Sequence, residues 1–358
     1  MALLQVPAQL DTVRRFCVVV NRPLPMRVWF NRQFALVHRV LQLIRDADTA
    51  RRFTLLCSHK DRYFVGYAAA HEHAVEPTQL PAADYVSWCL DFALTHHVDV
   101  FVPAYQADAI LAAQQQFSAA GIRVLAVADA HTLPRLHDKA WVYERLASEM
   151  PLPAWTRVQR ADEVMQAVQA LWEQGHEACI KPIVSIYGKG FHRLMRPDNL
   201  SRPRRGLTMP EWLSRQGTPL TPQLALEYLP GHEYSVDCIG DAGRLVTGVV
   251  RKKAITSKTQ LLENNPQLLR EAAHVLGSFA INGLVNVQFK TNRDGQPRLL
   301  EINPRPSGGV AMSCLSGVNL PWLALCGALD GFDMLDIPEA RLGIRVTEVS
   351  TPVVLPSV

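Results

Sequence analysis

Up to about residue 130, short runs rich in β-branched and aromatic residues alternate with longer segments of helical period. We expect strands at residues 16–20, 53–57, 98–102 and 122–127, and helices at residues 33–47, 83–96 and 107–120. In the first of these helices Phe34, Val37, Leu41 and Ile44 recur at three and four positions, so they form one apolar stripe. Strands that alternate with helices are typical of βαβ units, so residues 1–132 are predicted to form an α/β domain with a parallel sheet.

The pattern changes after residue 132. Helices are expected at residues 140–149 and 162–174, and antiparallel strands are expected around Gly231 and residues 241–243. This arrangement predicts a second, α+β domain over residues 133–358. Residues 196–222 are rich in proline and arginine and have weak periodicity, so they are interpreted as an insertion whose role the sequence does not show.

Composition narrows the class of protein. The 358 residues are 48% hydrophobic, which is enough for sizeable cores, and the net charge is only +4. Such a small net positive charge does not predict a strongly basic surface that would bind nucleic acid. No apolar run reaches the roughly 18 residues that a membrane-spanning helix needs. Seven cysteines form no CxxC pair, and the N-terminus lacks a secretory pattern. We therefore expect a reduced, cytoplasmic protein without nucleic-acid or membrane partners.

Zinc chemistry is not supported by the spacing of histidines and acidic residues. His71, Glu72 and His73 have no third ligand nearby in the sequence, and the HExxH pattern is not met. We expect these three residues to lie in a solvated loop.

The strongest chemical signal is a predicted hairpin near the C-terminal end. Residues 285–290 and 298–302 flank an Asp-Gly turn and should pair as antiparallel strands. Side chains two apart share a face, so Glu301 and Asn303 should lie together with Gln288 opposite. Oxygen ligands of this kind suit Mg²⁺. From spacing alone, a surface hairpin with a polar face explains the pattern equally well.

Four motifs together resemble the ATP-grasp superfamily, and particularly its carbamoyl-phosphate-synthetase-like branch. The hairpin ends in LEINPR at residues 300–305, which is similar to the metal-binding hairpin of that family. Lys139 stands in an Asp-Lys pair at a helix start, and Lys181 ends a strand before a glycine-containing loop at residues 185–190. The string EYLPGHEYSVD at residues 227–237 resembles the family's hinge.

The resemblance implies a fold and a reaction. An α/β N-terminal domain should precede an α+β ATP-grasp fold, in which two subdomains grip ATP between antiparallel sheets and residues from about 151 to 228 form the lid. The implied enzyme is an ATP-dependent ligase that joins a carboxylate to an amine through an acylphosphate and releases ADP and phosphate. ATP and Mg²⁺ are the implied cofactors, with Mn²⁺ as an alternative ion. Small-molecule carboxylates and amines are the implied partners, and a homodimer stays open.

The resemblance also assigns residues to roles. The implied nucleotide contacts are Lys139, Lys181, Ser185, Gly188, Lys189, Gly190, Glu227, Tyr228, Leu229 and Glu233. The implied metal ligands are Gln288, Glu301 and Asn303, and the implied catalytic residues are Arg305, Lys181 and Glu301. Candidates for the substrate side are Arg251, Lys253, Ser307, Gly308 and Gly309, where Arg251 and Lys253 are equally well explained as surface charges. No general base is identified.

Two other functions remain open at this point. A phosphotransferase would stop after phosphorylating its acceptor, and a non-catalytic regulator would only bind ATP. Glu301, Asn303 and Arg305 argue against the regulator, because sensing a nucleotide needs no clamp for the γ-phosphate. The identity of the carboxylate, of the amine and of the pathway is not readable from the sequence.

Overall fold

The structure is a computed structural model, and it describes residues 24–185, 188–196, 206–217 and 219–357. Its N-terminal region is a parallel sheet of five strands in the order β3-β2-β1-β4-β5. The strands are β1 (Met26–Asn31), β2 (Phe53–His59), β3 (Glu72–Val75), β4 (Val100–Val102) and β5 (Arg123–Val124). The predicted parallel α/β layer is therefore confirmed.

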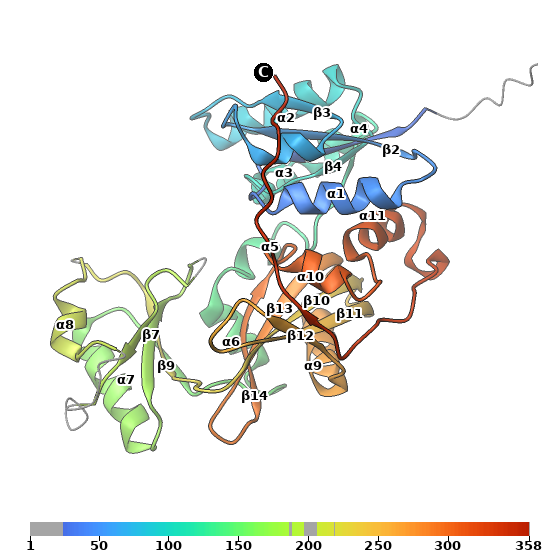
Figure 1. The fold of residues 1–358 in the computed structure, drawn as a ribbon. Helices are drawn as coiled ribbons and strands as arrows, with labels where there is room; N and C mark the ends of the chain where they lie inside the picture. The colour runs from blue at the N-terminus through green and yellow to red at the C-terminus, as the bar shows by residue number, and fades with distance from the viewer. Residues whose placement is uncertain (1–23, 186–187, 197–205, 218, 358) are drawn as a thin grey trace, which may run out of the picture.

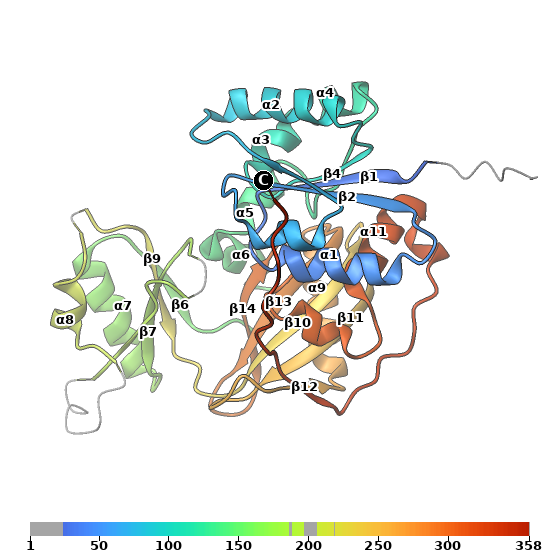
Figure 2. The ribbon, with the colours of Figure 1, turned by 45° about the horizontal axis from the view of Figure 1, so that its top comes forward.

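Helices cover both faces of this sheet, as parallel sheets require. Helix α1 (Val37–Ala47) covers the face turned to the rest of the molecule, and α2 (Ala82–Thr95), α3 (Ala107–Ala112) and α4 (Gln114–Ala119) cover the other (Figure 2). Side chains of β1 alternate accordingly: Trp29 joins the core under α2, and Val28 and Phe30 join the core under α1. A short 3₁₀ turn, η1 (Val65–Ala69), follows β2.

Some predictions for this region were wrong in detail, and one is not tested. The strand expected at residues 16–20 lies outside the described residues, and β1, which forms the centre of the sheet, was missed. The helix expected at 107–120 is broken at Ala113 into α3 and α4. His71 to His73 do not form a solvated loop, because Glu72 opens the edge strand β3, where its carboxylate pairs with Arg27 at 2.6 Å.

The second region begins with an antiparallel sheet of four strands in the order β6-β9-β7-β8. Its elements are β6 (Trp155–Val158), α7 (Ala161–Glu173), β7 (Ala178–Pro182), β8 (His192–Leu194), α8 (Met209–Leu213) and β9 (Gln223–Glu227). Val164, Val168 and Leu171 of α7 pack on this sheet in a core confined to it. The unit forms a separate lobe, on the left in Figure 1. Part of the proline- and arginine-rich segment lies here as α8, while residues 197–205 lie outside the described residues.

A larger antiparallel sheet has six strands in the order β14-β13-β10-β11-β12-β15. The strands are β10 (Glu233–Asp241), β11 (Arg244–Lys253), β12 (Gln260–Glu263), β13 (Gly283–Thr291), β14 (Pro297–Asn303) and β15 (Arg345–Val346). Its helices are α5 (Thr132–Arg135), α6 (Lys139–Leu146), α9 (Pro266–Ser278), α10 (Val310–Cys314) and α11 (Leu320–Asp330), with a 3₁₀ turn η3 (Phe332–Met334). The predicted hairpin is confirmed as β13 and β14.

Local chemistry explains where these helices start. The carboxylate of Asp138 accepts a hydrogen bond from Trp141 N at 3.0 Å and so caps α6. Asn265 and Asn319 cap α9 and α11 in the same way, and each helix has a proline in its first turn. The cap on α6 matters most here, because it fixes Lys139 as the first helical residue.

The two remaining core clusters extend across the parallel sheet and the six-stranded sheet, and one of them also includes Cys179, Leu224 and Leu226 of the four-stranded sheet. Helices α1 and α11 lie between the two sheets (Figure 1). The N-terminal region and the six-stranded sheet therefore form one packed body, to which the four-stranded lobe is attached. Within the described part of the chain, no helix is long and apolar enough to cross a membrane.

Candidate active site

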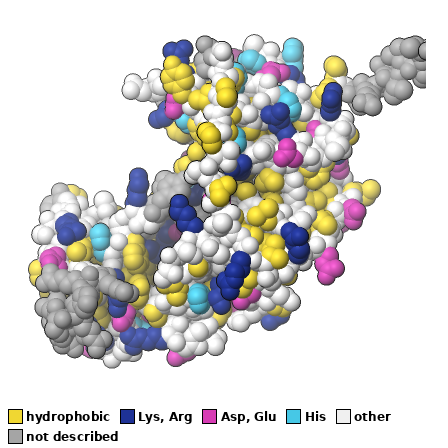
Figure 3. Space-filling model, viewed as in Figure 1, with side chains coloured by type: hydrophobic (Ala, Val, Ile, Leu, Met, Phe, Trp, Pro, Cys, Tyr) yellow, Lys and Arg dark blue, Asp and Glu magenta, His cyan; other side chains and the backbone are white. Residues whose placement is uncertain are grey.

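A cleft of about 550 Å³ lies between the four-stranded and the six-stranded sheet. Most residues singled out in the sequence line it: Lys139, Lys181, Ser185, Gly188, Glu227, Tyr228, Leu229, Glu233, Arg251, Lys253, Gln288, Glu301, Asn303, Arg305, Ser307, Gly308 and Gly309. Figure 3 shows Lys and Arg side chains beside the hollow that separates the two lobes. Four motifs that are far apart in the sequence thus meet in one place.

Lys189 and Gly190 do not line this cleft. Lys189 is exposed, and Gly190 lies against Pro182 in a left-handed conformation, with φ of +76°. Residues 186–187 of the same loop lie outside the described residues. Gly188 also has a positive φ of +66°, which favours glycine, and it does line the cleft.

Two buried lysines form the cationic part of the cleft. The Lys181 ammonium, at the end of β7, donates to Leu300 O at 3.3 Å, and burial together with Lys139 lowers its pKa to about 8. The Lys139 ammonium donates to Ser185 O at 3.1 Å and lies 3.7 Å from the Glu301 carboxylate. Burial lowers the pKa of Lys139, and Glu301 opposes that shift. One carboxylate thus faces two ammonium groups, so the site favours an added anion.

The β13–β14 hairpin places three oxygen-bearing side chains on the cleft wall. Gln288 is directly paired with Glu301, and Asn286 is paired with Asn303. Asn286 Oδ1 accepts hydrogen bonds from Gln288 Nε2 at 3.0 Å and from Asn303 Nδ2 at 3.5 Å. Because an amide oxygen lies opposite its nitrogen, these bonds turn the Gln288 and Asn303 oxygens away from Asn286.

This donor set fits Mg²⁺. One carboxylate and two amide oxygens are hard ligands, and Mg²⁺ in such sites takes its remaining ligands from water and substrate phosphates. Within the described ranges no group of three or more His, Cys, Asp or Glu side chains gathers as a metal site. A mixed site with a single carboxylate, Glu301, is therefore the candidate that these residues offer.

Behind the hairpin lies a buried network that the sequence analysis missed. Asp237 Oδ1 accepts from Asn286 Nδ2 at 2.8 Å, and Asp237 Oδ2 accepts from Arg251 Nε at 3.0 Å and Nη2 at 2.8 Å. Ser313 Oγ also donates to Asp237 Oδ2, at 2.6 Å. The position of Asn286, two residues before Gln288 on the same strand face, was the available signal. Asp237 is the last residue of the hinge string, but nothing local marks its partners.

The structure changes the interpretation of both substrate-side cations. Arg251 is 1% exposed and ion-paired with Asp237, so it is not a surface charge. Lys253 pairs with Glu233, the carboxylate that the resemblance assigns to ribose. Ser307 Oγ accepts from Arg251 Nη2 at 2.7 Å, and a Cβ at Gly309 would lie 2.5 Å from Arg251 Nη1. The Ser-Gly-Gly turn therefore packs closely over the buried guanidinium.

The hinge forms the other end of the cleft. Tyr228 N donates to Glu177 O at 2.6 Å, and the Tyr228 ring is covered by the Arg193 guanidinium at 4.6 Å. Glu227 Oε2 accepts from Ala154 N at 3.3 Å. Leu229 is buried. These contacts hold an apolar and aromatic wall opposite the charged end, which suits a planar base.

The charged end is completed by Arg305. Its Nη2 donates to Asn303 Oδ1 at 3.3 Å, and its guanidinium lies over the Phe34 ring, 4.9 Å from the ring centroid. Arg305 therefore links the metal-ligand hairpin to the N-terminal region.

Comparisons with known proteins agree with this geometry. Residues 220–352 match a family model described as ATP-grasp in the biosynthetic pathway with Ter operon. Carnosine synthase 1 of Gallus gallus is 33% identical over 119 residues, which are 30% of this chain and 13% of that protein. The chain therefore matches only a small part of that relative's length.

Two solved structures share the fold. An L-amino acid ligase from Bacillus licheniformis has a TM-score of 0.61 at 12% identity, over 85% of this chain and 74% of that one. The biotin carboxylase domain of Hydrogenobacter thermophilus 2-oxoglutarate carboxylase, in complex with MgADP, ADP and bicarbonate, has a TM-score of 0.61 at 13% identity, over 88% and 72%. These findings confirm the resemblance and the fold seen in the motifs.

Proposed function

We propose that this chain is an ATP-grasp ligase that joins a carboxylate to an amine at the expense of ATP. The observation that carries the proposal is the cleft in which Lys139, Lys181 and Arg305 meet the Gln288, Glu301 and Asn303 oxygens. The names of the similar proteins support ligation as the reaction class.

The nucleotide would lie with its base against residues 227–229 and its phosphates at the two lysines. Lys181 and Lys139 are point charges with rotatable donors, which suits phosphate oxygens. The pair of Lys253 and Glu233 lies where ribose hydroxyls would compete for the carboxylate. Mg²⁺ held by Gln288, Glu301 and Asn303 would neutralise charge on the transferring phosphoryl group.

The reaction then needs positioning more than covalent help. A substrate carboxylate oxygen attacks the γ-phosphorus, the bond from that phosphorus to the bridging oxygen breaks, and ADP leaves with the bonding electrons. The amine next attacks the acyl carbon, phosphate leaves, and the amine proton passes to solvent. Arg305 would hold the negative charge that gathers on the phosphoryl oxygens.

Separation of the nucleotide products tests this proposal. A substrate-stimulated reaction should release ADP and phosphate in equal amounts with an amide product. AMP and pyrophosphate as stoichiometric products would overturn the mechanism. A stable phosphorylated acceptor would instead identify a phosphotransferase, and nucleotide binding without turnover of any acceptor would identify a regulator.

A further inference from the structure

A second and larger cavity, of about 1040 Å³, lies between the parallel sheet and the six-stranded sheet. We name it the acceptor chamber, and its walls include Phe30, Val102, Leu125, Leu133, Ile302 and Leu325. We propose that the acceptor chamber binds the carboxylate substrate and that this substrate is an acid with a bulky apolar body. The proposal rests on the ligase function proposed above and names its substrate class.

The chamber and the nucleotide cleft meet at one set of residues. Lys139, Ser185, Glu301, Asn303 and Arg305 line both cavities. A ligand that fills the chamber therefore has one end beside the groups assigned to the γ-phosphoryl, and the hinge residues assigned to adenine lie in the cleft alone. A carboxylate at the shared end would be positioned for phosphorylation, with the rest of the molecule inside the chamber.

Several charged and amide groups of the chamber, outside the set shared with the cleft, are already engaged. Asp241 and Asp333 both pair with Arg244, at 2.7 and 2.9 Å, and Arg123 donates to Leu329 O at 3.5 Å. Gln33 Nε2 donates to Val102 O at 3.2 Å. A polar substrate body would lose its hydrogen bonds to water and find few new partners in the chamber, which costs binding free energy. An apolar body instead gains binding free energy from burial against aliphatic and aromatic walls.

The position of the chamber follows from the sheet topology. Strand β1 lies between β2 and β4, so the strand order reverses direction at the β1–β4 pair. The chamber is lined by Phe30, the last but one residue of β1, by Val102, the last residue of β4, and by Pro103 and Ala104 beyond β4. Crevices at the carboxyl ends of parallel strands, at such a reversal, are where open α/β sheets bind ligands.

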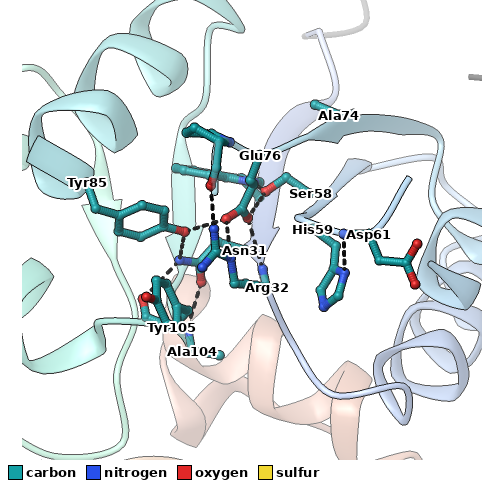
Figure 4. Close-up of polar contacts among 12 residues, drawn as sticks. Asn31, Arg32, Ser58, His59, Asp61, Ala74, Glu76, Tyr85, Ala104 and Tyr105 are labelled. Carbon is teal, nitrogen blue, oxygen red and sulfur yellow. Dashed lines mark hydrogen bonds and ion pairs between the residues drawn. The ribbon is translucent and has the colours of Figure 1, made fainter. Parts of the chain in front are cut away.

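A buried network anchors the loop that forms one wall (Figure 4). The Glu76 carboxylate accepts from Ser58 Oγ at 2.7 Å, from Tyr85 Oη at 2.7 Å, and from Arg32 N at 3.1 Å and Nε at 3.0 Å. Arg32 has a φ of +29°, an uncommon conformation for a residue with a side chain, and these bonds hold it there. The neighbouring Asn31 accepts from Ala104 N at 2.7 Å.

The consequence is a fixed wall. Gln33 and Phe34 follow Arg32 directly and line the chamber, and Phe34 contacts Arg305 at the shared end. A loop held by a buried carboxylate that accepts four hydrogen bonds loses little conformational entropy when a ligand binds. The chamber can therefore select acids by their shape without a large rearrangement.

Calorimetry with simple acids tests the proposal, in the presence of Mg²⁺ and a non-hydrolysable ATP analogue. The probes are propanoate, hexanoate, 3-phenylpropanoate and glutarate, the last being a polar match for hexanoate in length. Each buried methylene should strengthen binding about fourfold, so hexanoate should bind roughly 60-fold more tightly than propanoate. Glutarate binding as tightly as hexanoate would overturn the proposal, as would the binding of none of the acids.

Filling the chamber from opposite walls provides the second measurement. Ala126→Phe and Ala324→Phe each add a ring inside the chamber, and Ala119→Phe adds the same ring on the exposed side of α4. The first two variants should weaken 3-phenylpropanoate at least tenfold and leave the affinity for the ATP analogue unchanged, while the third should change neither. Unchanged acid binding in both filled variants contradicts the proposal. Loss of all nucleotide binding in the unmodified protein would instead contradict the ligase function itself.

Discussion

Two buried carboxylates each hold an arginine, yet their networks end differently: Glu76 directly follows β3 of the parallel sheet, and Asp237 lies in β10 of the six-stranded sheet. Glu76 is 2% exposed and its donors, Ser58, Tyr85 and Arg32, stop at a loop. Asp237 is fully buried, and its contact with Asn286 continues to the cleft wall. Similar local chemistry therefore fixes a shape in one region and orients candidate metal ligands in the other.

The largest effect is expected where the Asp237 network reaches the cleft. Glu301→Gln should lower kcat by about 1000-fold or more, because a neutral amide no longer offsets metal and lysine charge during phosphoryl transfer. Nucleotide affinity, measured by calorimetry, should remain within a few fold, because the hinge contacts are separate. Glu263→Gln is the matched control, since Glu263 also lies 3.7 Å from a lysine, Lys252, but does not line the cleft. Wild-type kcat in Glu301→Gln would show that the assignment of Glu301 is wrong.

Breaking the Glu76 network should reduce stability rather than chemistry. Glu76→Gln leaves the Arg32 guanidinium, whose side chain is 9% exposed, without its charge partner, and the free energy of unfolding should fall by about 3 kcal/mol. Denaturant titration measures this change. Glu72→Gln removes a half-exposed partner of Arg27 in the same sheet and should cost less than about 1 kcal/mol. An equal loss of unfolding free energy in Glu76→Gln and Glu72→Gln would show that the buried ion pair contributes no more to stability than the half-exposed one.

Breaking the other network should weaken metal binding without removing any ligand. In Asn286→Ala the Gln288 and Asn303 amides lose their common acceptor, so Mg²⁺ affinity in the presence of ADP should fall about 10- to 100-fold. Mn²⁺ titration followed by electron paramagnetic resonance measures this without turnover. Asn265→Ala removes the cap of α9, which does not line the cleft, and controls for general destabilisation. If both variants bind metal like the wild type, Asn286 has no positioning role.

The smallest effect concerns pH. The pKa of Lys181 is lowered to about 8 in the folded protein, whereas a solvated lysine titrates near 10.5. Between these values the unfolded chain binds more protons, so the contribution of Lys181 to stability rises with pH. Nucleotide binding has the opposite dependence, because phosphates need the ammonium form, and affinity should fall about tenfold from pH 7 to pH 9. The slope should flatten in Lys181→Arg, and an unchanged slope would exclude Lys181 as its source.

The hairpin and its three oxygen ligands could be predicted because they depend on local rules. Alternation along a strand and an Asp-Gly turn are enough to pair Gln288 with Glu301. The fold followed from motifs in order along the chain. The hairpin depends on residues that are close in sequence, and the fold was inferred from a pattern of motifs that the family resemblance supplies.

The missed features all depend on distant partners. The sequence alone suggests that Arg251 is a surface charge near the end of a strand. Only the fold places it beside Asp237 and Ser313. The acceptor chamber has walls from β1, β4 and α11, and no single segment marks it. Strand β1 was missed because only three of its six residues, Val28 to Phe30, form an unbroken apolar run, with Arg27 and Asn31 on either side. Its pairing with β2 and β4 places it at the centre of the sheet.

The four-stranded lobe has a core of its own, and Lys139 is one of its attachments to the body. Lys139 N donates to Ile183 O at 3.3 Å, and Lys139 Nζ donates to Ser185 O, so one residue joins the lobe through its backbone and through its charge. A phosphate that takes the ammonium from Ser185 releases one of these two tethers. Phosphate binding at Lys139 is therefore expected to make the lobe more mobile relative to the body. A fluorophore pair, with one dye on the lobe and one on the body, would detect nucleotide binding as a change in the distance between the dyes.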